Sequence, residues 1–430
     1  MTQVPIQADF GTIGSTFGNH KADMVSVGRG GDLWIRYPDG TLKNLTRAAG
    51  LGVEGRDQAG DNAIAVRDPS VHWDGQKALV SLVRGAPTRQ HEVKAHYWQI
   101  YEITGLGRDD MPVARRMPNQ PADFNNLTPL CGTDDRIIFT SDRPRNGARH
   151  LYPQLDEYES HTTNTGLWSL DPRVTGGALR LLNHAPSGNF SPSVDSWGRV
   201  VFTQWDHLMR DQQAGDPSFG TFNYASEAAD AARLSNSAEV FPETRDADEA
   251  QRQGINRHVF NHFLPWTVLE DGSGGETLNH LGRHELHTFF ERSFVNDPSL
   301  SGFSGNHDRP VYNLFQMKED PLKPGRYVGV DAPEFQTHAS GQIVTIDAPH
   351  GQPTLQARVT YITHPATKFP ADAPTPDHSG LYRDPLPLSD GKLVAAHSTG
   401  VRAEDPRAPR SLYDFRLKTL KATPSGAWVA

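Results

Sequence analysis

Short stretches of alternating hydrophobic and polar residues recur along the chain, each about five residues long and bounded by glycine, proline or aspartate. The clearest is the segment 31–46, GDLWIRYPDGTLKNLT. Its residues Leu33, Ile35 and Tyr37 alternate with Asp32, Trp34 and Arg36, and Pro-Asp-Gly follows before leucines resume. A period of two predicts strands, and the turn residues predict that the two strands pair antiparallel.

A second unit consists of a proline, an acidic or glycine turn, and a strand that ends in a small polar residue. It occurs as DPSVHWDGQKALVSLV, TPLCGTDDRIIFTSDR, SPSVDSWGRVVFTQWD and DPLPLSDGKLVAAHST, which begin at Asp68, Thr128, Ser191 and Asp384. In the first three copies the prolines lie about sixty residues apart. Further copies of the first unit fall between these segments, over residues 165–184, 265–282 and 341–360.

Two strands from each unit make a four-stranded antiparallel meander. Such meanders repeated around an axis form a β-propeller, in which only short strand edges are left open. We therefore predict an all-β fold, a propeller of four-stranded antiparallel blades, with six blades expected and seven as the alternative count. A large β-sandwich is the structural alternative, but it does not require the repeated block.

Aromatic residues occupy matching places in several of the predicted strands. A blade core needs large apolar side chains at such places, and β-propensity favours aromatic residues there. We expect four of them to be core residues and not a ligand platform: Trp34, Phe139, Trp168 and Phe202.

The whole chain, residues 1–430, is expected to form one propeller domain with two interruptions of the repeat. Residues 211–254 are polar and include an alanine-rich stretch that favours a short helix, so they are expected to form an insertion on the rim or cap. Residues 363–378 contain four prolines and are expected to form an extended, exposed loop. Insertions of this size are common places for function.

Composition narrows the possible functions. The net charge is −9, so no broad nucleic-acid surface is expected. No run of 18 apolar residues occurs, so no transmembrane segment is expected, and no secretory signal is visible in the first twenty residues. Cys131 is the single cysteine, which excludes an intrachain disulfide and a Cys-x-x-Cys-His site for covalent haem attachment.

Several segments resemble known propellers. Residues 129–143 are similar to the repeat of TolB-type six-bladed propellers. A longer set of segments resembles the middle, propeller domain of hydrazine synthase alpha-subunit-like proteins: 66–75, 137–160, 191–208, 276–286 and 332–343. This resemblance implies a periplasmic or extracytoplasmic propeller that forms one part of a larger assembly. It does not imply haem chemistry, because the chain has no haem attachment motif.

Histidines are dense in one part of the chain and make a candidate metal site. Imidazoles and a carboxylate suit zinc or another borderline metal, and pairs four residues apart would share one face of a helix. The alternative is that these are loop histidines bonded to nearby backbone. The group comprises His258, His262, His280, His284, Glu285 and His287. A cluster of carboxylates at 156–160 could bind calcium, or it could be a solvated acidic turn.

Two further pairs could act as acid and base in the central channel. Asp206 and His207 directly follow a predicted strand, where the aspartate could orient the imidazole or instead cap a turn. Glu334 and His338 lie on a predicted loop between two strands. None of these pairs completes a known catalytic motif.

These observations favour a propeller that binds a protein partner or a small ligand at one face. The alternative is a metal-dependent enzyme, a hydrolase or an oxidoreductase subunit, that uses the histidines between 258 and 287. A third possibility is a purely structural subunit whose insertions hold an assembly together.

Overall fold

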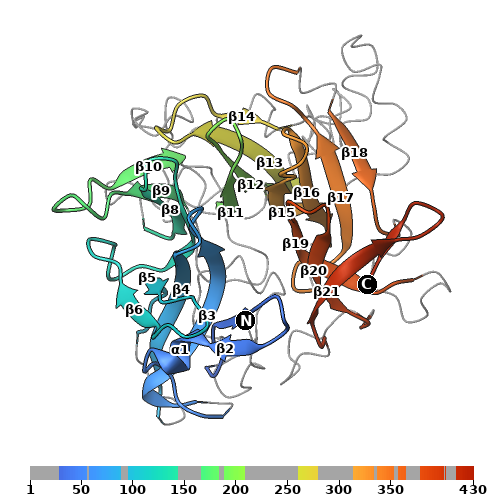
Figure 1. Ribbon diagram of the computed structural model, residues 1–430. Helices are drawn as coiled ribbons and strands as arrows, with labels where there is room; N and C mark the ends of the chain where they lie inside the picture. The colour runs from blue at the N-terminus through green and yellow to red at the C-terminus, as the bar shows by residue number, and fades with distance from the viewer. Residues whose placement is uncertain are drawn as a thin grey trace.

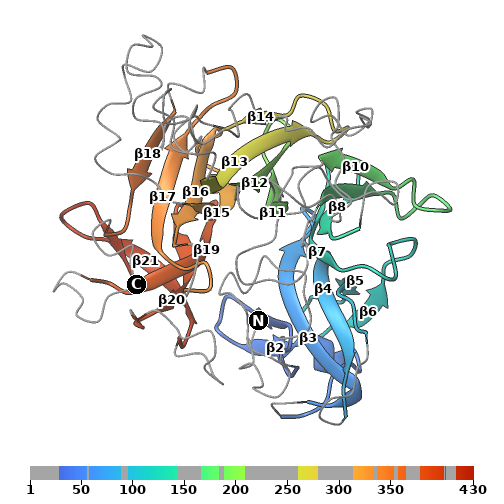
Figure 2. The same cartoon turned by 180° about the vertical axis from the view of Figure 1, so that it is seen from behind.

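The computed structural model describes residues 29–55, 58–88, 95–143, 166–183, 188–208, 260–278, 313–333, 337–352, 357–364, 378–400, 402 and 413–430. For residues 205–208, 260–262 and 358 the description covers the backbone alone. Within these ranges the protein is built almost entirely from strands, and five four-stranded antiparallel sheets stand around a common centre (Figures 1 and 2). The predicted all-β propeller is confirmed.

Each sheet is a meander whose four strands follow one another in chain order. The first blade consists of β3 (Gly60–Val71), β4 (Lys77–Ala86), β5 (Gln99–Thr104) and β6 (Val113–Arg116). The second consists of β7 (Asn126–Cys131), β8 (Ile137–Ser141), β9 (Gly166–Leu170) and β10 (Arg180–Asn183). The third consists of β11 (Asn189–Val194), β12 (Arg199–Leu208), β13 (Phe260–Leu269) and β14 (Glu276–Thr277).

The last two blades repeat the same plan. The fourth consists of β15 (Leu314–Glu319), β16 (Arg326–Asp331), β17 (Gln342–Asp347) and β18 (Arg358–Tyr361). The fifth consists of β19 (Leu381–Pro387), β20 (Leu393–Ser398), β21 (Arg416–Ala422) and β22 (Trp428–Val429). The first strand of every blade is the innermost, and β3, β7, β11, β15 and β19 each contact the next around the centre (Figure 2).

A two-stranded sheet occupies the gap between the first and fifth blades (Figures 1 and 2). It pairs β1 (Trp34–Arg36) with β2 (Leu42–Asn44), and the short helix α1 (Leu45–Ala48) follows, with Asn44 as its N-cap. The described residues thus form five complete blades, and the expected count of six is not confirmed. The repeat predicted the internal order of a blade correctly, but the sixth position holds only two described strands.

The blades adhere through apolar side chains that face each other across every junction. Phe139 and Trp168 of the second blade pack with Leu79 and Ile100 of the first. The two-stranded sheet joins the first blade in the same way, because Leu33 packs with its core. Burial of such side chains is the main force that stabilises the ring.

Three of the four aromatic core predictions are confirmed. Phe139 and Phe202 are fully buried and Trp168 nearly so. Trp34 is 39% exposed, so its assignment to the core was wrong. The reason is the alternation of side chains along this segment: Leu33, directly before β1, packs with the first blade, so its neighbour Trp34 must face the other way.

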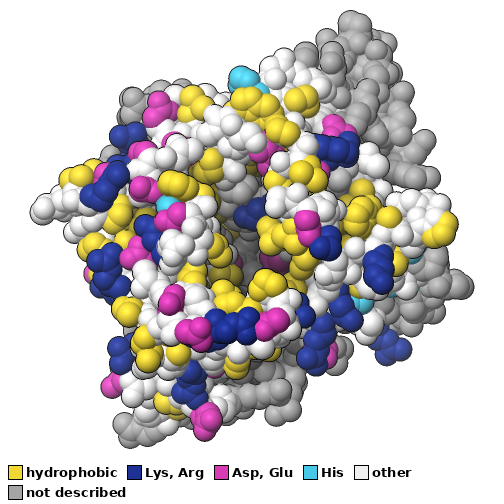
Figure 3. Space-filling view, in the orientation of Figure 1, with side chains coloured by type: hydrophobic (Ala, Val, Ile, Leu, Met, Phe, Trp, Pro, Cys, Tyr) yellow, Lys and Arg dark blue, Asp and Glu magenta, His cyan; other side chains and the backbone are white. Residues whose placement is uncertain are grey.

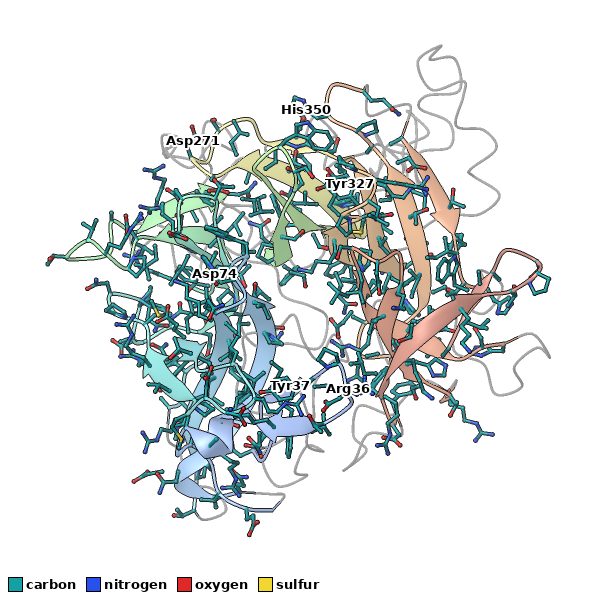
Figure 4. The ribbon with its side chains drawn as sticks, viewed as in Figure 1. Arg36, Tyr37, Asp74, Asp271, Tyr327 and His350 are labelled. Atoms are coloured by element: carbon teal, nitrogen blue, oxygen red, sulfur yellow. The ribbon has the colours of Figure 1, made fainter. Side chains whose placement is uncertain are left out.

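A buried polar clamp ties the third blade to the fourth. The Arg199 guanidinium pairs with Asp195 at 2.9 Å and donates to the Tyr327 hydroxyl at 2.9 Å. That hydroxyl in turn donates to Asp195 at 2.9 Å. Tyr327 is fully buried, and Figure 4 places it at the junction of these blades. Burial and the nearby Asp195 raise the pKa of Tyr327, so it remains a neutral donor.

None of the helices in the described ranges has the length and hydropathy needed to cross a bilayer. The insertion predicted at 211–254 lies outside the described residues, as do all but the ends of the proline-rich loop at 363–378. At the start of that loop Thr363 is buried, and its hydroxyl accepts the backbone N–H of Ile343 at 2.8 Å.

The clamp makes a prediction about stability. Tyr327→Phe removes a hydroxyl that both accepts and donates inside the protein, so we expect the free energy of unfolding to fall by about 1–2 kcal/mol. Tyr37→Phe is the matched control, because the Tyr37 hydroxyl donates to a single carbonyl, that of Leu106. Denaturant unfolding of both variants measures the difference. Equal losses in the two variants would contradict a special role for the clamp.

Candidate functional site

All five innermost strands carry a β-bulge at the same place. The register against the second strand shifts there in every blade. One residue at each shift has left-handed backbone, with φ between 50° and 59°: Asp68, Thr128, Ser191, Gln316 and Asp384. None of them is glycine, so each costs about 1 kcal/mol of backbone strain. Bulges re-aim side chains, and here they do so at the centre of a ring.

The sequence repeat explains four of the five bulges. Asp68, Thr128, Ser191 and Asp384 are the first residues of the four repeat copies, and each precedes a proline. Proline has no N–H and a fixed φ, so it cannot continue a regular ladder and is found at bulges. In β15 Gln316 precedes Met317 instead, which is why the proline pattern does not reveal the fourth blade.

Two of the bulges hold an ion pair between adjacent residues. In β3 the Arg67 guanidinium lies 2.7 Å from the Asp68 carboxylate, and in β19 Arg383 and Asp384 repeat this at 2.7 Å. Both arginines are buried, Arg67 over the ring of Trp98 and Arg383 over that of Phe415. The aspartates are more accessible than the arginines. Each arginine therefore fixes a carboxylate at the channel without itself being open to solvent.

The charges of both carboxylates act on a lysine of the fourth blade. Lys318, two residues after the bulge in β15, senses the charges of Asp384 and Asp68. β15 and β3 belong to blades that do not adjoin in the ring. Figure 3 shows a hollow at the centre of the molecule with basic and acidic side chains at its wall.

The environment of Lys318 disfavours its charge. The Lys318 side chain is half-buried. Burial lowers the pKa of Lys318, and the attraction of Asp384 and Asp68 offsets this only in part. A lysine whose amine is neutral more often than usual can act as a base or a nucleophile.

The bulge of β15 is connected directly to that of β19. The Gln316 side-chain oxygen accepts the backbone N–H of Asp384 at 2.7 Å. Gln316 is itself buried. Because this hydrogen bond joins the bulge of β15 to the bulge of β19, it fixes the position of Asp384 relative to β15 along the axis of the ring.

The residues before the other three bulges are apolar and buried. The residues before the bulges are Leu127, Phe190 and Phe315 in the second, third and fourth blades, where the first and fifth have arginine. Phe263 lies between the two phenylalanines, 6.1 Å from Phe190 and 5.0 Å from Phe315 between ring centroids. Arginine thus precedes the bulge only in the two blades beside the gap, the first and the fifth.

The structure places few of the predicted site residues. Asp206 and His207 belong to β12, where Asp206 pairs in register with His262 of β13, and only their backbone is described. His262 lies in a strand, so a helical spacing with His258 does not apply to it. Four metal candidates lie outside the described residues: His258, His280, His284 and His287. Glu285 and the acidic cluster at 156–160 also lie outside them.

Of the second predicted acid–base pair, only His338 is described, and Glu334 lies outside. His338 is buried on the turn between β16 and β17, edge-on to the Tyr413 ring at 5.8 Å. Within the described ranges no group of three or more histidines, cysteines or carboxylates is arranged to hold a metal. Burial raises the pKa of the Cys131 thiol to about 11, so it is not a thiolate nucleophile at neutral pH.

Histidines do gather around Ser379, at the end of the proline-rich loop. His364 lies 3.2 Å from the Ser379 hydroxyl, and His397 lies 2.5 Å from its carbonyl oxygen. His378 accepts the backbone N–H of Gly380 at 2.9 Å. Burial lowers the pKa of His397, so it stays neutral at physiological pH. These contacts anchor the loop, which is a structural role.

Comparison with known proteins establishes the fold. No family model matches the chain, and no curated protein does. Among solved structures, hydrazine synthase of Kuenenia stuttgartiensis matches all of this chain with a TM-score of 0.53 and 15% identity. This chain spans 44% of that chain. The likeness agrees with the resemblance found in the sequence, at the level of a propeller fold.

Two weaker likenesses involve other propellers. A putative TolB from Agrobacterium tumefaciens has a TM-score of 0.32 and 13% identity, over 77% of this chain and 79% of that chain. A GH43_1 enzyme from Xanthomonas citri has a TM-score of 0.36 and 11% identity, over 85% and 90%.

The burial of Lys318 predicts how stability depends on pH. Because the folded pKa is lower than the unfolded value, the unfolded chain binds more protons between the two, and stability rises with pH across that interval. Lys318→Met should raise the free energy of unfolding at pH 7 by about 1 kcal/mol and flatten the rise toward alkaline pH. Urea unfolding between pH 6 and 10 tests this. Lys323→Met, at an exposed position of the same blade, should change neither the free energy of unfolding nor its dependence on pH.

Proposed function

We propose that the protein is a ligand-binding β-propeller that forms one part of a larger assembly, and that a small polar ligand binds in the central channel at the height of the bulges. The observation that supports this most is that the charges of Asp68 and Asp384, from two other blades, act on Lys318. A channel that served only to close the ring would not need them.

The energetics of the channel support a functional reading. A lysine with a lowered pKa pays a desolvation cost, and five left-handed residues add strain. Groups that lower stability in this way concentrate at functional sites.

Exposed apolar side chains support a protein partner at one face. They lie at or near the turns that join the first and second strands of the blades, on β3, β15–β16 and β19. Val71, Trp73, Leu322 and Leu386 are each exposed there by 48–75%. Apolar side chains that gather on one surface favour protein contacts. An extracytoplasmic location, which the sequence resemblance implies, is part of the same proposal.

A ligand screen tests the channel. Wild-type protein, Asp384→Asn and Asp390→Asn are melted with a panel of small sugars, amines, carboxylates and hydroxy-aldehydes. A compound at a hundred times its Kd adds about 2.7 kcal/mol to the stability of the folded state, so Tm should rise by a few degrees. We expect at least one compound to do this for wild type.

Asp390 is the matched control, because it lies in the same blade on an exposed turn and pairs with Lys392. The shift should persist in Asp390→Asn and be largely lost in Asp384→Asn. A panel without any stabilising compound, or a shift equal in both variants, would contradict binding in the channel.

A further inference from the structure

We propose that an extended, acidic segment of a partner protein binds at the junction between the fifth blade and the two-stranded sheet, where it adds a strand to the open edge of β1. The inference rests on the proposed function, since it assumes that the protein forms part of a larger assembly. It adds where a partner binds and what chemistry that partner offers.

This junction differs from the others in the ring. Clusters of buried apolar side chains join the two-stranded sheet to the first blade and each later blade to the next. Within the described ranges, no such cluster contains residues of both the fifth blade and the two-stranded sheet. The two elements stand beside each other (Figures 1 and 2) without sharing a core.

The fifth blade exposes the sheet face that looks away from the fourth blade. Every residue of β9 and all but one of β17 are buried, whereas β21, the third strand of the fifth blade, buries only Leu420. Leu420 packs toward the fourth blade, so Leu417, three positions earlier, lies on the opposite face and is 68% exposed. Leu386 shares that face, because it pairs with Val394 and Val394 pairs with Thr419. It is 48% exposed.

The two-stranded sheet also exposes apolar side chains on the face that looks away from the first blade. Leu33 and Ile35 pack with the first blade, so Trp34 and Arg36 face the other way. Leu42 pairs with Arg36 and therefore lies on the same side. Trp34 is 39% exposed and Leu42 60%. Figure 4 shows Arg36 on the side of the sheet toward the fifth blade.

The backbone of β1 offers an edge for a further strand. The N–H of Tyr37 donates to the carbonyl of Thr41 at 2.9 Å. Only every second residue of an antiparallel strand bonds to a given neighbour, so the backbone groups of Trp34 and Arg36 point to the other edge of β1. In the described parts of the chain these groups form no hydrogen bond. An extended segment can pair with such an edge.

The charges at this junction select an acidic segment. Arg36 lies on one wall, and Lys421 lies on the other, on the same face of β21 as Leu417. Both basic side chains are exposed, and neither has an ion-pair partner among the described residues. A segment that alternates apolar residues with aspartate or glutamate matches both the exposed leucines and these charges.

A peptide library tests the inference. A phage-displayed library of random dodecapeptides is panned on the immobilised full chain, and the most enriched peptide is synthesised with a fluorescent label. We expect the enriched sequences to alternate apolar and polar residues and to contain aspartate or glutamate. Fluorescence anisotropy then measures the Kd of the labelled peptide for wild type and variants.

Leu417→Glu should weaken binding at least about tenfold, because it places a negative charge on the wall that an acidic peptide contacts. Val174→Glu is the matched control, since Val174 is 45% exposed on a turn of the second blade. It should leave the Kd unchanged. Both positions are exposed, so circular dichroism and Tm of the two variants should match wild type.

Two variants of Trp34 test the added strand itself. Trp34→Ala removes the side chain alone, whereas Trp34→Pro also removes the N–H at the open edge of β1. We expect the proline variant to bind about tenfold more weakly than the alanine variant, with an equal Tm. Hydrogen exchange of the Trp34 and Arg36 amides should slow when the peptide binds.

Several results would overturn the inference. They are a library without an enriched peptide, equal binding by Leu417→Glu and wild type, and equal binding by the two Trp34 variants. Slow exchange of the Trp34 amide before any peptide is added would show that the edge is already covered. A wild-type dimer in sedimentation that Leu417→Glu dissociates would show that a second copy binds there instead.

The ligand screen distinguishes this failure from failure of the proposed function. If a compound stabilises wild type but not Asp384→Asn while no peptide binds, the junction is wrong and ligand binding in the channel stands. If neither the compounds nor the peptides bind, both are wrong.

Discussion

Each innermost strand has a hydrogen-bonded neighbour on one side only, and its other edge faces the channel. This constraint shapes the rest of the molecule. An open edge of regular strand is a place where another strand can add. In every blade the edge is interrupted by a bulge with a left-handed residue, and in four of five a proline follows. The bulge ends regular pairing and turns a side chain toward the centre.

The strain of five such residues is offset at the junctions between blades. Clusters of buried apolar side chains span each junction from the first blade to the fifth. Polar contacts such as the Asp195–Arg199–Tyr327 clamp fix the relative height of neighbouring sheets. A further stacking contact joins Trp197 to His350, whose rings lie 5.8 Å apart (Figure 4). These rigid junctions between the blades allow the centre of the ring to hold residues that lower the free energy of unfolding.

The fold could be predicted in large part from the residues. Alternation and turn residues over 31–46 gave the pairing of β1 with β2, and the proline repeats at 68, 128, 191 and 384 marked four innermost strands. The innermost strand of the fourth blade was missed because Met317 stands where the others have proline, although the copy at 341–360 covered β17 and β18. The blade count could not be predicted, since the blades have similar sequence patterns. Closure of the ring depends on how the two ends of the chain meet.

The candidate site was harder to predict. Histidine density drew attention to 258–287, whereas the described channel is built from Arg-Asp pairs and a lysine that look like ordinary surface charges in the sequence. The repetition of Arg-Asp-Pro at 67–69 and 383–385 was the signal available. It could not indicate Lys318, which lies in the blade without the proline.

The sequence by itself determined the strands, their order within a blade and the places where the inner strands break, because these depend on local periodicity and on proline. Only the tertiary structure decided that the charges of Asp68 and Asp384 act on Lys318. They are separated by up to 316 positions in the chain, and the lowered pKa of the lysine arises from its burial when five sheets stand around one axis.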